Sequence, residues 1–437
     1  MTAWAAAEQT RSRLRGTRRV DVAIVGAGLT GLSAALELLE LDPDLRVVVV
    51  DRATVAGGAS GRGTGLLGTR VGPSLTRARR RYGDDLARAA YLWSVSAVRH
   101  VLDLVARHSI GCDLVHGTQL VVADDEPGAA AQLTEADAAA ALGLPITLVA
   151  RDELPAVAAR YTSGLRYAPA ATVDPAALTE WLARLGEERG LTIHEGTAVR
   201  GIRSGLRTTV VTADGELHAD NVIVAVNAFG AHLGVPPGVV GVTVQAGVTE
   251  QLSSAALAAV AGLRTEPLIG AAELSAYYRL TEDGRMVVGG RAIQGNTTAL
   301  AAPAPQRLGA AVRELSPALA DTRLLATWAG PIGVTVDGMP VVGRHPDDRG
   351  LYYAGGCNGH GLAGSVCNGA FLARWIVNGE HEELTFALPW VRSSAPWIPR
   401  GRLANRVLDR YLAHLTAVAG RRTTGIPRRE EAHHVGS

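Results

Sequence analysis

The sequence predicts an α/β fold, with a nucleotide-binding unit at the start of the chain and a β-rich region further along it. Three observations lead to this prediction. A glycine-rich turn joins an apolar strand to a helix just after residue 20, and a second glycine-rich loop lies near residue 355. Between residues 191 and 290, several short segments alternate in polarity or run apolar, as strands do.

The opening unit carries Gly26, Gly28 and Gly31 in the pattern G-x-G-x-x-G, between an apolar strand and a helix. Gly26 permits a tight turn, and Gly28 lets backbone N–H groups approach a pyrophosphate. Gly31 lets the helix pack closely on the strand. A pyrophosphate is therefore expected at the positive end of the helix, beside Leu29 and Thr30.

The next apolar run ends at Asp51, and Arg52 follows it directly. This position is close to the roughly 20-residue spacing expected for the carboxylate that binds ribose hydroxyls in a dinucleotide fold. A carboxylate at this place also disfavours a 2′-phosphate. The unit therefore predicts a Rossmann-like domain that binds a dinucleotide, and by itself it leaves the dinucleotide open.

The composition excludes several classes of function. A chain of 437 residues can form two domains, and its net charge of +1 provides no field that would recruit nucleic acid or an anionic membrane. All 43 basic side chains counted as Lys or Arg are arginines, which excludes Schiff-base and lysine general-base chemistry.

Three scattered cysteines, Cys112, Cys357 and Cys367, are too few for a disulfide framework or a structural zinc site. They indicate a reduced, cytoplasmic location. Acidic residues interrupt the apolar stretch 20–41, so no membrane span is expected there. The histidines show no ligand spacing, and no metal site is predicted.

Further elements follow from periodicity and capping signals. One long helix is expected over residues 74–108, a strand over 112–123 and an alanine-rich helix that ends near Leu142. Asp174 and Pro175 provide an N-cap and a first-turn proline for a helix that runs to about Gly190. Strands are expected at 191–194, 197–202, 208–212, 221–226 and within 239–290.

The second glycine loop, Gly355-Gly-Cys-Asn-Gly-His360-Gly-Leu362, lies between a short strand and a helix that runs to about Val377. Two such loops in one chain require a ligand that reaches both. FAD does so, because its pyrophosphate can lie at the first helix while its isoalloxazine ring reaches the second. The helix dipole and loop N–H groups there would stabilise the negative charge that arises on reduction. NAD gives the second loop no role.

These motifs resemble those of the FAD-dependent D-amino-acid oxidase superfamily, which includes glycine and sarcosine oxidases. The resemblance spans residues 18–379 and rests on five motifs in order: the opening glycines, Gly58-Ala-Ser-Gly-Arg62, Tyr277-Tyr-Arg-Leu280 with 284–290, Trp328-Ala-Gly330 with 337–343, and 356–361. Within the superfamily, the Gly359-His360-Gly361 loop and the Tyr-Tyr-Arg strand look most like the γ-glutamylputrescine oxidase branch.

The resemblance implies an FAD-binding Rossmann-like domain of the glutathione-reductase type, interleaved with an antiparallel-sheet α+β substrate domain. The FAD-binding domain is expected to comprise residues 18–85, 155–235 and 321–385, and the substrate domain residues 86–154 and 236–320. Residues 386–420 are expected to form a C-terminal helical extension, and residues 1–17 and 421–437 to form mobile tails.

Three residues are candidates for a direct role in catalysis. Arg62 either contacts the flavin or pairs with a nearby carboxylate. His360 either places a donor or a positive charge near the flavin or bonds loop backbone. Tyr277 either lines the substrate site or belongs to the core.

The resemblance also implies a set of cofactor-binding residues. They lie in the two glycine loops and in the matching segments between them: Gly26, Gly28, Leu29, Thr30, Gly31, Asp51, Arg52, Ser60, Arg62, Gly63, Thr64, Val199, Asn227, Trp328, Gly330, Gly356, Cys357, Asn358, Gly359, His360, Gly361 and Leu362. For Trp328, packing and flavin contact both remain open, and Cys357 is interpreted as a neutral buried thiol.

The chain departs from the family pattern at several places. Members that oxidise amino acids carry a carboxylate-binding arginine two residues after the Trp-Ala-Gly triplet, where this chain has Ile332, which disfavours a simple α-amino acid. Sarcosine-type relatives tether FAD to a cysteine; the matching residue is Gly330, so FAD is expected to be noncovalent. Thr64 replaces a glycine. Because no lysine is available to activate dioxygen, either arginine or histidine supplies the charge or another acceptor is used.

The sequence therefore predicts an FAD-dependent oxidoreductase that takes a hydride from the C–H next to an amine nitrogen and yields an imine. Its partners would be a small amine or amino compound and either O2 or another electron acceptor. Two alternatives remain: a dehydrogenase of the same fold that passes electrons to a quinone or a carrier protein, and a biosynthetic enzyme that acts on an unusual nitrogen compound. The motifs specify neither the substrate nor the oligomeric state.

Overall fold

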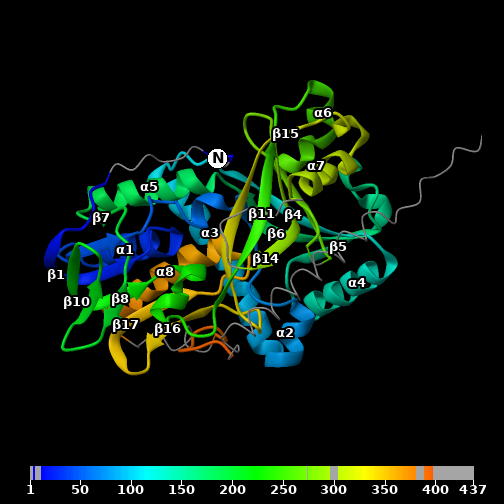
Figure 1. The fold of residues 1–437 in the computed structure, drawn as a ribbon. Helices are drawn as coiled ribbons and strands as arrows, with labels where there is room; N and C mark the ends of the chain where they lie inside the picture. The colour runs from blue at the N-terminus through cyan, green and yellow to red at the C-terminus, as the bar shows by residue number, and fades with distance from the viewer. Residues whose placement is uncertain (1–2, 5–10, 273, 296–303, 380–387, 397–437) are drawn as a thin grey trace, which may run out of the picture.

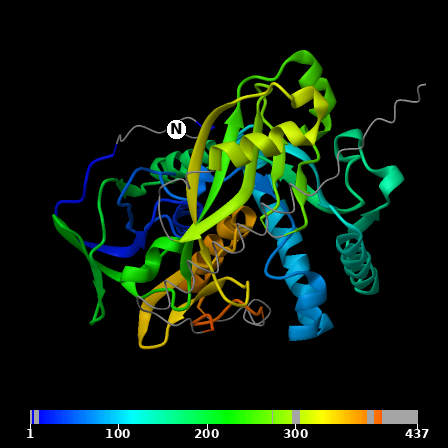
Figure 2. The same ribbon diagram turned by 45° about the vertical axis from the view of Figure 1, so that its right-hand side comes forward.

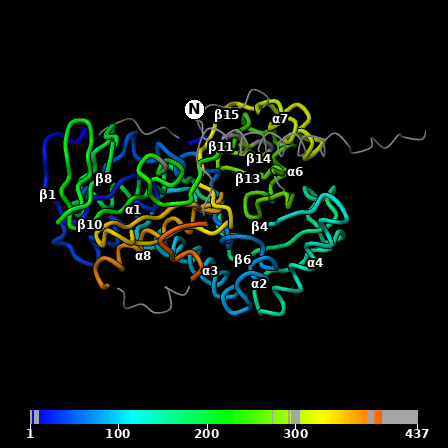
Figure 3. Tube along the Cα trace, turned by 60° about the horizontal axis from the view of Figure 1, so that its bottom comes forward, coloured from blue at the N-terminus to red at the C-terminus, as the bar shows by residue number. Residues whose placement is uncertain are grey.

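The computed structural model describes residues 3–4, 11–272, 274–295, 304–379 and 388–396. Within these residues the chain forms two sheets, with helices around and between them (Figure 1). A view from another side separates the same two parts, with β1 and β10 at one end of the molecule and α4 at the other (Figure 3). The predicted α/β class with two sheet-based parts is confirmed.

The first sheet contains the opening strand–turn–helix unit. In spatial order its described strands are β16 (Val341–His345), β17 (Asp348–Gly355), β10 (Gly215–Val224), β1 (Gly16–Val25), β2 (Val47–Val50) and β7 (Thr192–His194), with β9 (Thr208–Val211) on β10 and β8 (Gly201–Arg203) on β9. The central pairs are parallel, and every residue of β2 is buried. Apolar runs of this kind are typical of strands that helices cover on both faces.

The second sheet is larger and mostly antiparallel. Its described strands in order are β15 (Leu324–Val334), β11 (Val240–Thr249), β14 (Met286–Gly295), β13 (Tyr277–Leu280), β12 (Leu268–Gly270), β4 (Val115–Ala123), β6 (Ser163–Thr172) and β3 (Leu66–Leu67), with β5 (Ile146–Val149) on β6. The prediction of an antiparallel sheet is wrong at one pair: β12 runs parallel to β4, with Leu268 beside Leu120.

The described helices are α1 (Leu29–Leu41), α2 (Leu75–Tyr82), α3 (Asp84–His108), α4 (Glu126–Ala141), α5 (Pro175–Glu188), α6 (Ser254–Val260), α7 (Ala304–Leu315) and α8 (Gly361–Asn378). In Figure 2, α6 and α7 lie at the top of the second sheet, and α2 and α3 extend below it. Short 3-10 turns occur at 60–62, 151–153, 156–158, 227–233, 261–264 and 317–319. In the part of the chain that the structure describes, no helix has the length and apolar character needed to cross a bilayer.

The predicted long helix over 74–108 is wrong as a single element. It is divided into α2 and α3 at Gly83, whose φ of +83° few other residues adopt. Periodicity continues across this break because both helices bury an apolar side. Asp174 caps α5 as predicted, since its carboxylate accepts hydrogen bonds from the N–H groups of Ala176 and Ala177, both at 2.9 Å.

The predicted domain boundaries differ from the sheets in two respects. Residues 86–108 lie within α3, which shares the main hydrophobic core with α1 and α8 and so packs with the first sheet's helices. Conversely, β3, β6 and β15 belong to the second sheet although they fall within the predicted FAD-binding segments. Each of these strands joins its sheet by pairing with strands that are distant in sequence. Periodicity along the chain does not identify those partner strands.

The prediction of a mobile tail is wrong for residues 11–17. Arg11 forms ion pairs with Glu180 at 2.9 Å, Glu187 at 2.7 Å and Glu195 at 3.3 Å. Leu14 is fully buried in the core of the first sheet, and β1 begins at Gly16. Residues 397–437, which include the tail at 421–437 and most of the predicted 386–420 helix, lie outside the described residues, and 388–396 contain no helix.

Helices α1 and α8 approach each other at Gly369. A Cβ atom on Gly369 would lie 2.2 Å from the carbonyl oxygen of Thr30, far inside van der Waals contact. The hydroxyl of Ser33 also donates a 2.7 Å hydrogen bond to the carbonyl of Val366. The two helices therefore pack backbone against backbone.

We expect Gly369→Ala to lower the free energy of unfolding by about 1–3 kcal/mol, because the added methyl group must push the two helices apart. Gly364→Ala is the matched control in the same helix, where a Cβ would meet the Trp93 ring at an ordinary 3.7 Å. The control should be neutral or gain up to about 1 kcal/mol of helix propensity. Urea denaturation measures both, and equal effects of the two substitutions would contradict the proposed contact.

Candidate active site

A cavity of about 950 Å³ extends from the first glycine turn, past the second glycine loop, to the face of the second sheet. The N-termini of α1 and α8 both open into it, at Leu29 and Gly361. Because the first N–H groups of a helix have no partner within the helix, both ends are positive and can bind anionic groups. The cavity therefore offers two such ends to a single ligand.

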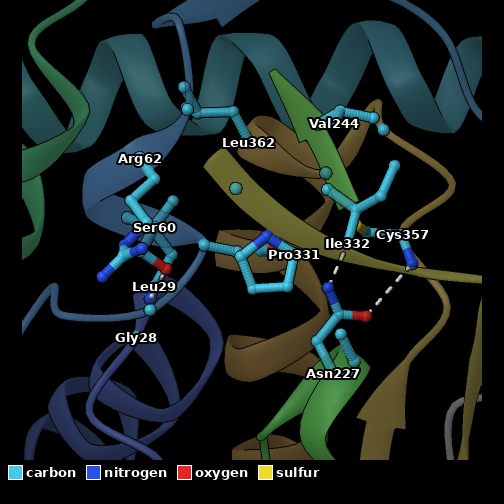
Figure 4. Close-up of a pocket in the computed structure, with 18 of the residues that line it drawn as sticks. Gly28, Leu29, Ser60, Arg62, Asn227, Val244, Pro331, Ile332, Cys357 and Leu362 are labelled. Carbon is cyan, nitrogen blue, oxygen red and sulfur yellow. Dashed lines mark hydrogen bonds between the residues drawn. The ribbon is translucent and has the colours of Figure 1, made fainter. Parts of the chain in front are cut away.

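The first glycine turn is too close to its surroundings for larger residues. A Cβ atom on Gly26, whose φ is +114°, would lie 2.6 Å from the carbonyl oxygen of Ala225. A Cβ on Gly28 would lie 2.8 Å from the Ser60 hydroxyl, which accepts a 3.0 Å hydrogen bond from the Leu29 N–H. Figure 4 shows Ser60 beside Leu29 at one side of the cavity.

Asp51 lies in the cavity wall at the end of β2, as predicted from its spacing. Its carboxylate accepts hydrogen bonds from the N–H groups of Ala27 at 2.8 Å and Ala53 at 2.7 Å. Burial raises the pKa of this carboxyl, and the two backbone hydrogen bonds oppose that shift. Lone pairs remain on both oxygens for ligand hydroxyls. The guanidinium of Arg52 lies 3.9 Å over the Phe229 ring.

Two indoles bind the loop Arg62–Thr64, one from β15 and one from the N-terminal segment. Trp328 Nε1 donates to the carbonyl of Arg62, and Trp4 Nε1 donates to the carbonyl of Gly63, both at 2.9 Å. Because a trans peptide directs its C=O and N–H in opposite directions, the N–H of Thr64 points away from Trp4. The Arg62 guanidinium donates to the carbonyl of Ala329 at 3.2 Å.

The second glycine loop is held by two asparagines. Asn227 begins the 3-10 segment that follows β10. Its side chain accepts hydrogen bonds from the N–H groups of Gly356 at 3.0 Å and Cys357 at 3.5 Å, and it donates to the Cys357 sulfur at 3.2 Å. Asn358 accepts a 2.9 Å hydrogen bond from the N–H of Thr335, after β15. Figure 4 shows Asn227 and Cys357 joined across from Ser60, with Pro331 near the centre.

Comparison with known proteins decides the family. The DAO family of FAD dependent oxidoreductases matches residues 21–375. This chain belongs to that family. The family inferred from the five motifs is therefore confirmed, and the protein is an FAD-dependent oxidoreductase.

The relatives of this oxidoreductase agree with the predicted branch. It is 28% identical over 374 residues to gamma-glutamylputrescine oxidoreductase of Escherichia coli (strain K12), covering 83% of this chain and 84% of that protein. It is likewise 28% identical over 362 residues to the probable oxidoreductase OrdL of Rhizobium meliloti (strain 1021), covering 79% and 80%. The crystal structure of glycine oxidase from Geobacillus kaustophilus superposes with a TM-score of 0.72 at 23% identity, covering 86% and 98%, which shows a shared fold.

The residues of this oxidoreductase fit FAD. Among the predicted cofactor-binding residues, all but Gly31 and Gly356 line the cavity. Gly31 acts through packing, since a Cβ there would lie 2.0 Å from the carbonyl oxygen of Gly26. Gly356 has a φ of +71° and directs its N–H to Asn227. The carbonyl of Val199, another of these residues, lies 3.2 Å from the His232 ring nitrogen. The contacts of these residues with FAD remain a prediction.

Of the three predicted catalytic residues, all line the cavity. Tyr277 is hydrogen-bonded with Thr64, and burial raises the pKa of its hydroxyl to about 12. Burial and the charge of Arg70 lower the pKa of His360 to about 3. His360 is therefore neutral at pH 7, which favours a role as a hydrogen-bond donor or acceptor over a role as a source of positive charge.

Arg279, two residues after Tyr277 in β13, does not line the cavity. Its guanidinium is fully buried and donates to the carbonyls of Gly65 at 3.1 Å and Val173 at 2.6 Å. Sequence reasoning missed other lining residues that lie on the second sheet or just before α2: Arg70, Gln119, Tyr167, Ile269 and Ile293. No motif marks them, since the cavity is completed by strands that are distant in sequence.

Removing the Asn227 side chain should weaken FAD binding, by roughly tenfold, because the second loop loses the acceptor of its N–H groups. Asn227 has a φ of +44°, so Asn227→Ala also introduces backbone strain, whereas Asn227→Gly does not. Fluorescence titration of apoprotein with FAD measures both variants. If only the alanine variant binds FAD more weakly, backbone strain causes the effect. The proposed role of the Asn227 side chain in holding the second loop would then be wrong.

The low pKa of His360 implies that the free energy of unfolding depends on pH. Between about pH 6.5 and pH 3 the unfolded imidazole is protonated while the folded one is neutral, so this residue reduces stability as the pH falls. We expect His360→Gln to make the decline of the unfolding free energy shallower in that window. His116→Gln, on the exposed surface of β4, is the control. An unchanged slope in the His360 variant would show that its imidazole titrates normally.

Proposed function

We propose that this flavoenzyme oxidises the C–N bond of an amine or N-substituted amino compound to an imine. Bound FAD supplies the chemistry by accepting a hydride from the carbon next to the nitrogen. The observation that carries the proposal is the cavity itself, which continues beyond both glycine loops to a wall formed by the second sheet. Relatives named for glycine and gamma-glutamylputrescine support an amino compound as substrate.

Two side chains of the cavity wall, Tyr277 and His360, favour an uncharged amine as the reacting form. Tyr277 keeps its proton across the neutral range because burial raises its pKa to about 12, and His360 is neutral there because burial lowers its pKa to about 3. Neither side chain is therefore a base tuned to remove an ammonium proton near pH 7. The amine must lose that proton to solvent, after which its lone pair can assist C–H cleavage.

Ile332 also bears on the substrate. It lines the cavity, with a methyl group 3.6 Å from where a Cβ of Gly359 would lie, and it offers no charge to a carboxylate. In the resembling amino-acid oxidases this position is an arginine. A simple α-amino acid is therefore disfavoured relative to an amine or a larger amino compound.

The purified protein should be yellow, and a suitable amine should bleach its flavin under anaerobic conditions. Below the pKa of the amine, kcat/KM should rise about tenfold per pH unit, because only the neutral amine reacts. Stopped-flow measurement with two amines of different pKa tests this. If the profile fails to move with the amine pKa, or shifts in His360→Gln, a protein base is acting instead.

One observation favours a second candidate, a dehydrogenase that uses an acceptor other than dioxygen. The chain contains no lysine and His360 is neutral, so an arginine of the cavity wall would have to supply the positive charge that activates dioxygen. Slow reoxidation in air together with rapid reduction of a quinone or dye would support this candidate. Rapid reoxidation by dioxygen would support an oxidase.

A further inference from the structure

A tryptophan near the start of the chain, Trp4, packs behind the Arg62–Thr64 loop. It precedes β1, which begins at Gly16, so it is an addition to the nucleotide-binding unit. Its side chain is buried in a small apolar cluster with residues of the second sheet: Ala246, Val248, Val287 and Trp328. Trp4 is not among the described residues that line the cavity. It therefore supports the cavity wall from behind.

The indole of Trp4 binds one carbonyl of this loop. Its Nε1 donates a 2.9 Å hydrogen bond to the carbonyl of Gly63. The same ring lies 5.2 Å from the guanidinium carbon of Arg279, within the range of a cation–π contact. Arg279 in turn donates to the carbonyl of Gly65 at 3.1 Å. The carbonyls on both sides of Thr64 are therefore bound by two side chains that contact each other.

The N–H of Thr64 is left available to a ligand. The Gly63–Thr64 peptide directs its carbonyl toward Trp4, so its N–H points the opposite way. Because Trp4 lies behind the loop and Thr64 lines the cavity, we infer that this N–H faces the cavity. Within the described chain no group accepts a hydrogen bond from it, whereas the Thr64 side chain is hydrogen-bonded with Tyr277. A polar group of this kind is suited to bind an electron-rich atom.

The Arg62–Thr64 loop lies at the end of the cavity that fits the flavin ring. A Cβ atom on Gly330 of β15 would lie 3.6 Å from the Cβ of Arg62. Two residues further along β15, a methyl group of Ile332 lies 3.6 Å from where a Cβ of Gly359 would be, in the second glycine loop. One strand thus borders both loops. The loop N–H and the N-terminus of α8 can therefore act on the same ligand ring.

We propose that Trp4 is a positioning residue, which keeps the N–H of Thr64 directed at the flavin end of the cavity and so favours two-electron reduction of bound FAD. Without the indole N–H, the Gly63 carbonyl loses its buried donor, and the peptide can rotate toward the cavity. An acceptor would then replace a donor beside a ring that gains negative charge. The inference concerns the cofactor, so it is independent of the compound that the enzyme oxidises.

The test is the midpoint potential of the flavin in the holoenzyme, measured anaerobically with dithionite against a dye of known potential. Trp4→Phe keeps an aromatic ring beside Arg279 and removes the donor. We expect this variant to lower the equilibrium constant for two-electron reduction about tenfold, which corresponds to about 30 mV. Trp181→Phe, on α5 and outside the described cavity lining, is the control and should leave the potential unchanged. An unchanged potential in Trp4→Phe overturns the proposal.

Titration of the apoprotein distinguishes positioning from a purely structural role. Trp4→Phe should weaken the binding of reduced FAD about tenfold more than the binding of oxidised FAD, because the Thr64 N–H acts on the charge that reduction adds. If the variant weakens the binding of both forms equally, Trp4 only stabilises the fold near the loop, and the proposal is wrong.

A second pair of variants tests the N–H of Thr64 directly. Thr64→Pro removes this N–H, and the extended backbone of Gly63, with a ψ of 160°, is compatible with a following proline. Thr64→Ala keeps the N–H and is the control for the lost hydroxyl. Thr64→Pro should lower the potential at least as much as Trp4→Phe, and combining the two should add little. Fully additive effects would show that Trp4 acts on the flavin by another route and would overturn the proposal.

Discussion

The close contact between α1 and α8 is the constraint on which the site depends. Gly369 has no side chain, so the backbone of α8 can lie against the carbonyl of Thr30, at the start of α1. Each helix follows a strand of the same sheet, β1 or β17, and this contact brings their N-termini to one cavity. A bulkier residue at this crossing would separate the end that fits a pyrophosphate from the end that fits a flavin ring.

The electrostatics of the cavity follow from that arrangement. The cavity is bordered by two positive helix ends and three guanidinium groups. Asp51 is the only carboxylate in its described lining. Nearby carbonyls are directed away from the ligand space: the indoles of Trp4 and Trp328 bind those of the Arg62–Thr64 loop. The chain thus offers donors and positive charge to an anionic dinucleotide, whose ring gains negative charge on reduction.

The second sheet contributes a different chemistry. Its side chains at the cavity are mostly apolar or neutral, and burial raises the pKa of Tyr167 and Tyr277, so both hydroxyls stay protonated near pH 7. Such a wall excludes water and orients a substrate without exchanging protons with it. This division between the two sheets supports the proposed reaction, in which the protein positions the substrate and supplies no acid–base pair.

Local sequence patterns predicted the features that local backbone geometry dictates. Both glycine loops, the Asp174 cap and the position of Asp51 depend on residues close together in the chain, where turn sterics and helix periodicity act. The division of the 74–108 segment at Gly83 was missed, because the same apolar period continues on both sides of a single positive-φ residue. The ordered segment at Arg11 was missed because its three glutamate partners lie far along the chain.

The sequence by itself determined the family, the cofactor and the loops that fit it, since these reside in short motifs whose spacing is set by the backbone. Tertiary structure alone decided which strands joined the second sheet, that His360 is neutral, and that Arg70 faces the cavity. The physical reason is that burial, charge coupling and strand pairing depend on neighbours in space. The cofactor end of the site can therefore be predicted from the sequence, whereas the substrate end requires the tertiary structure.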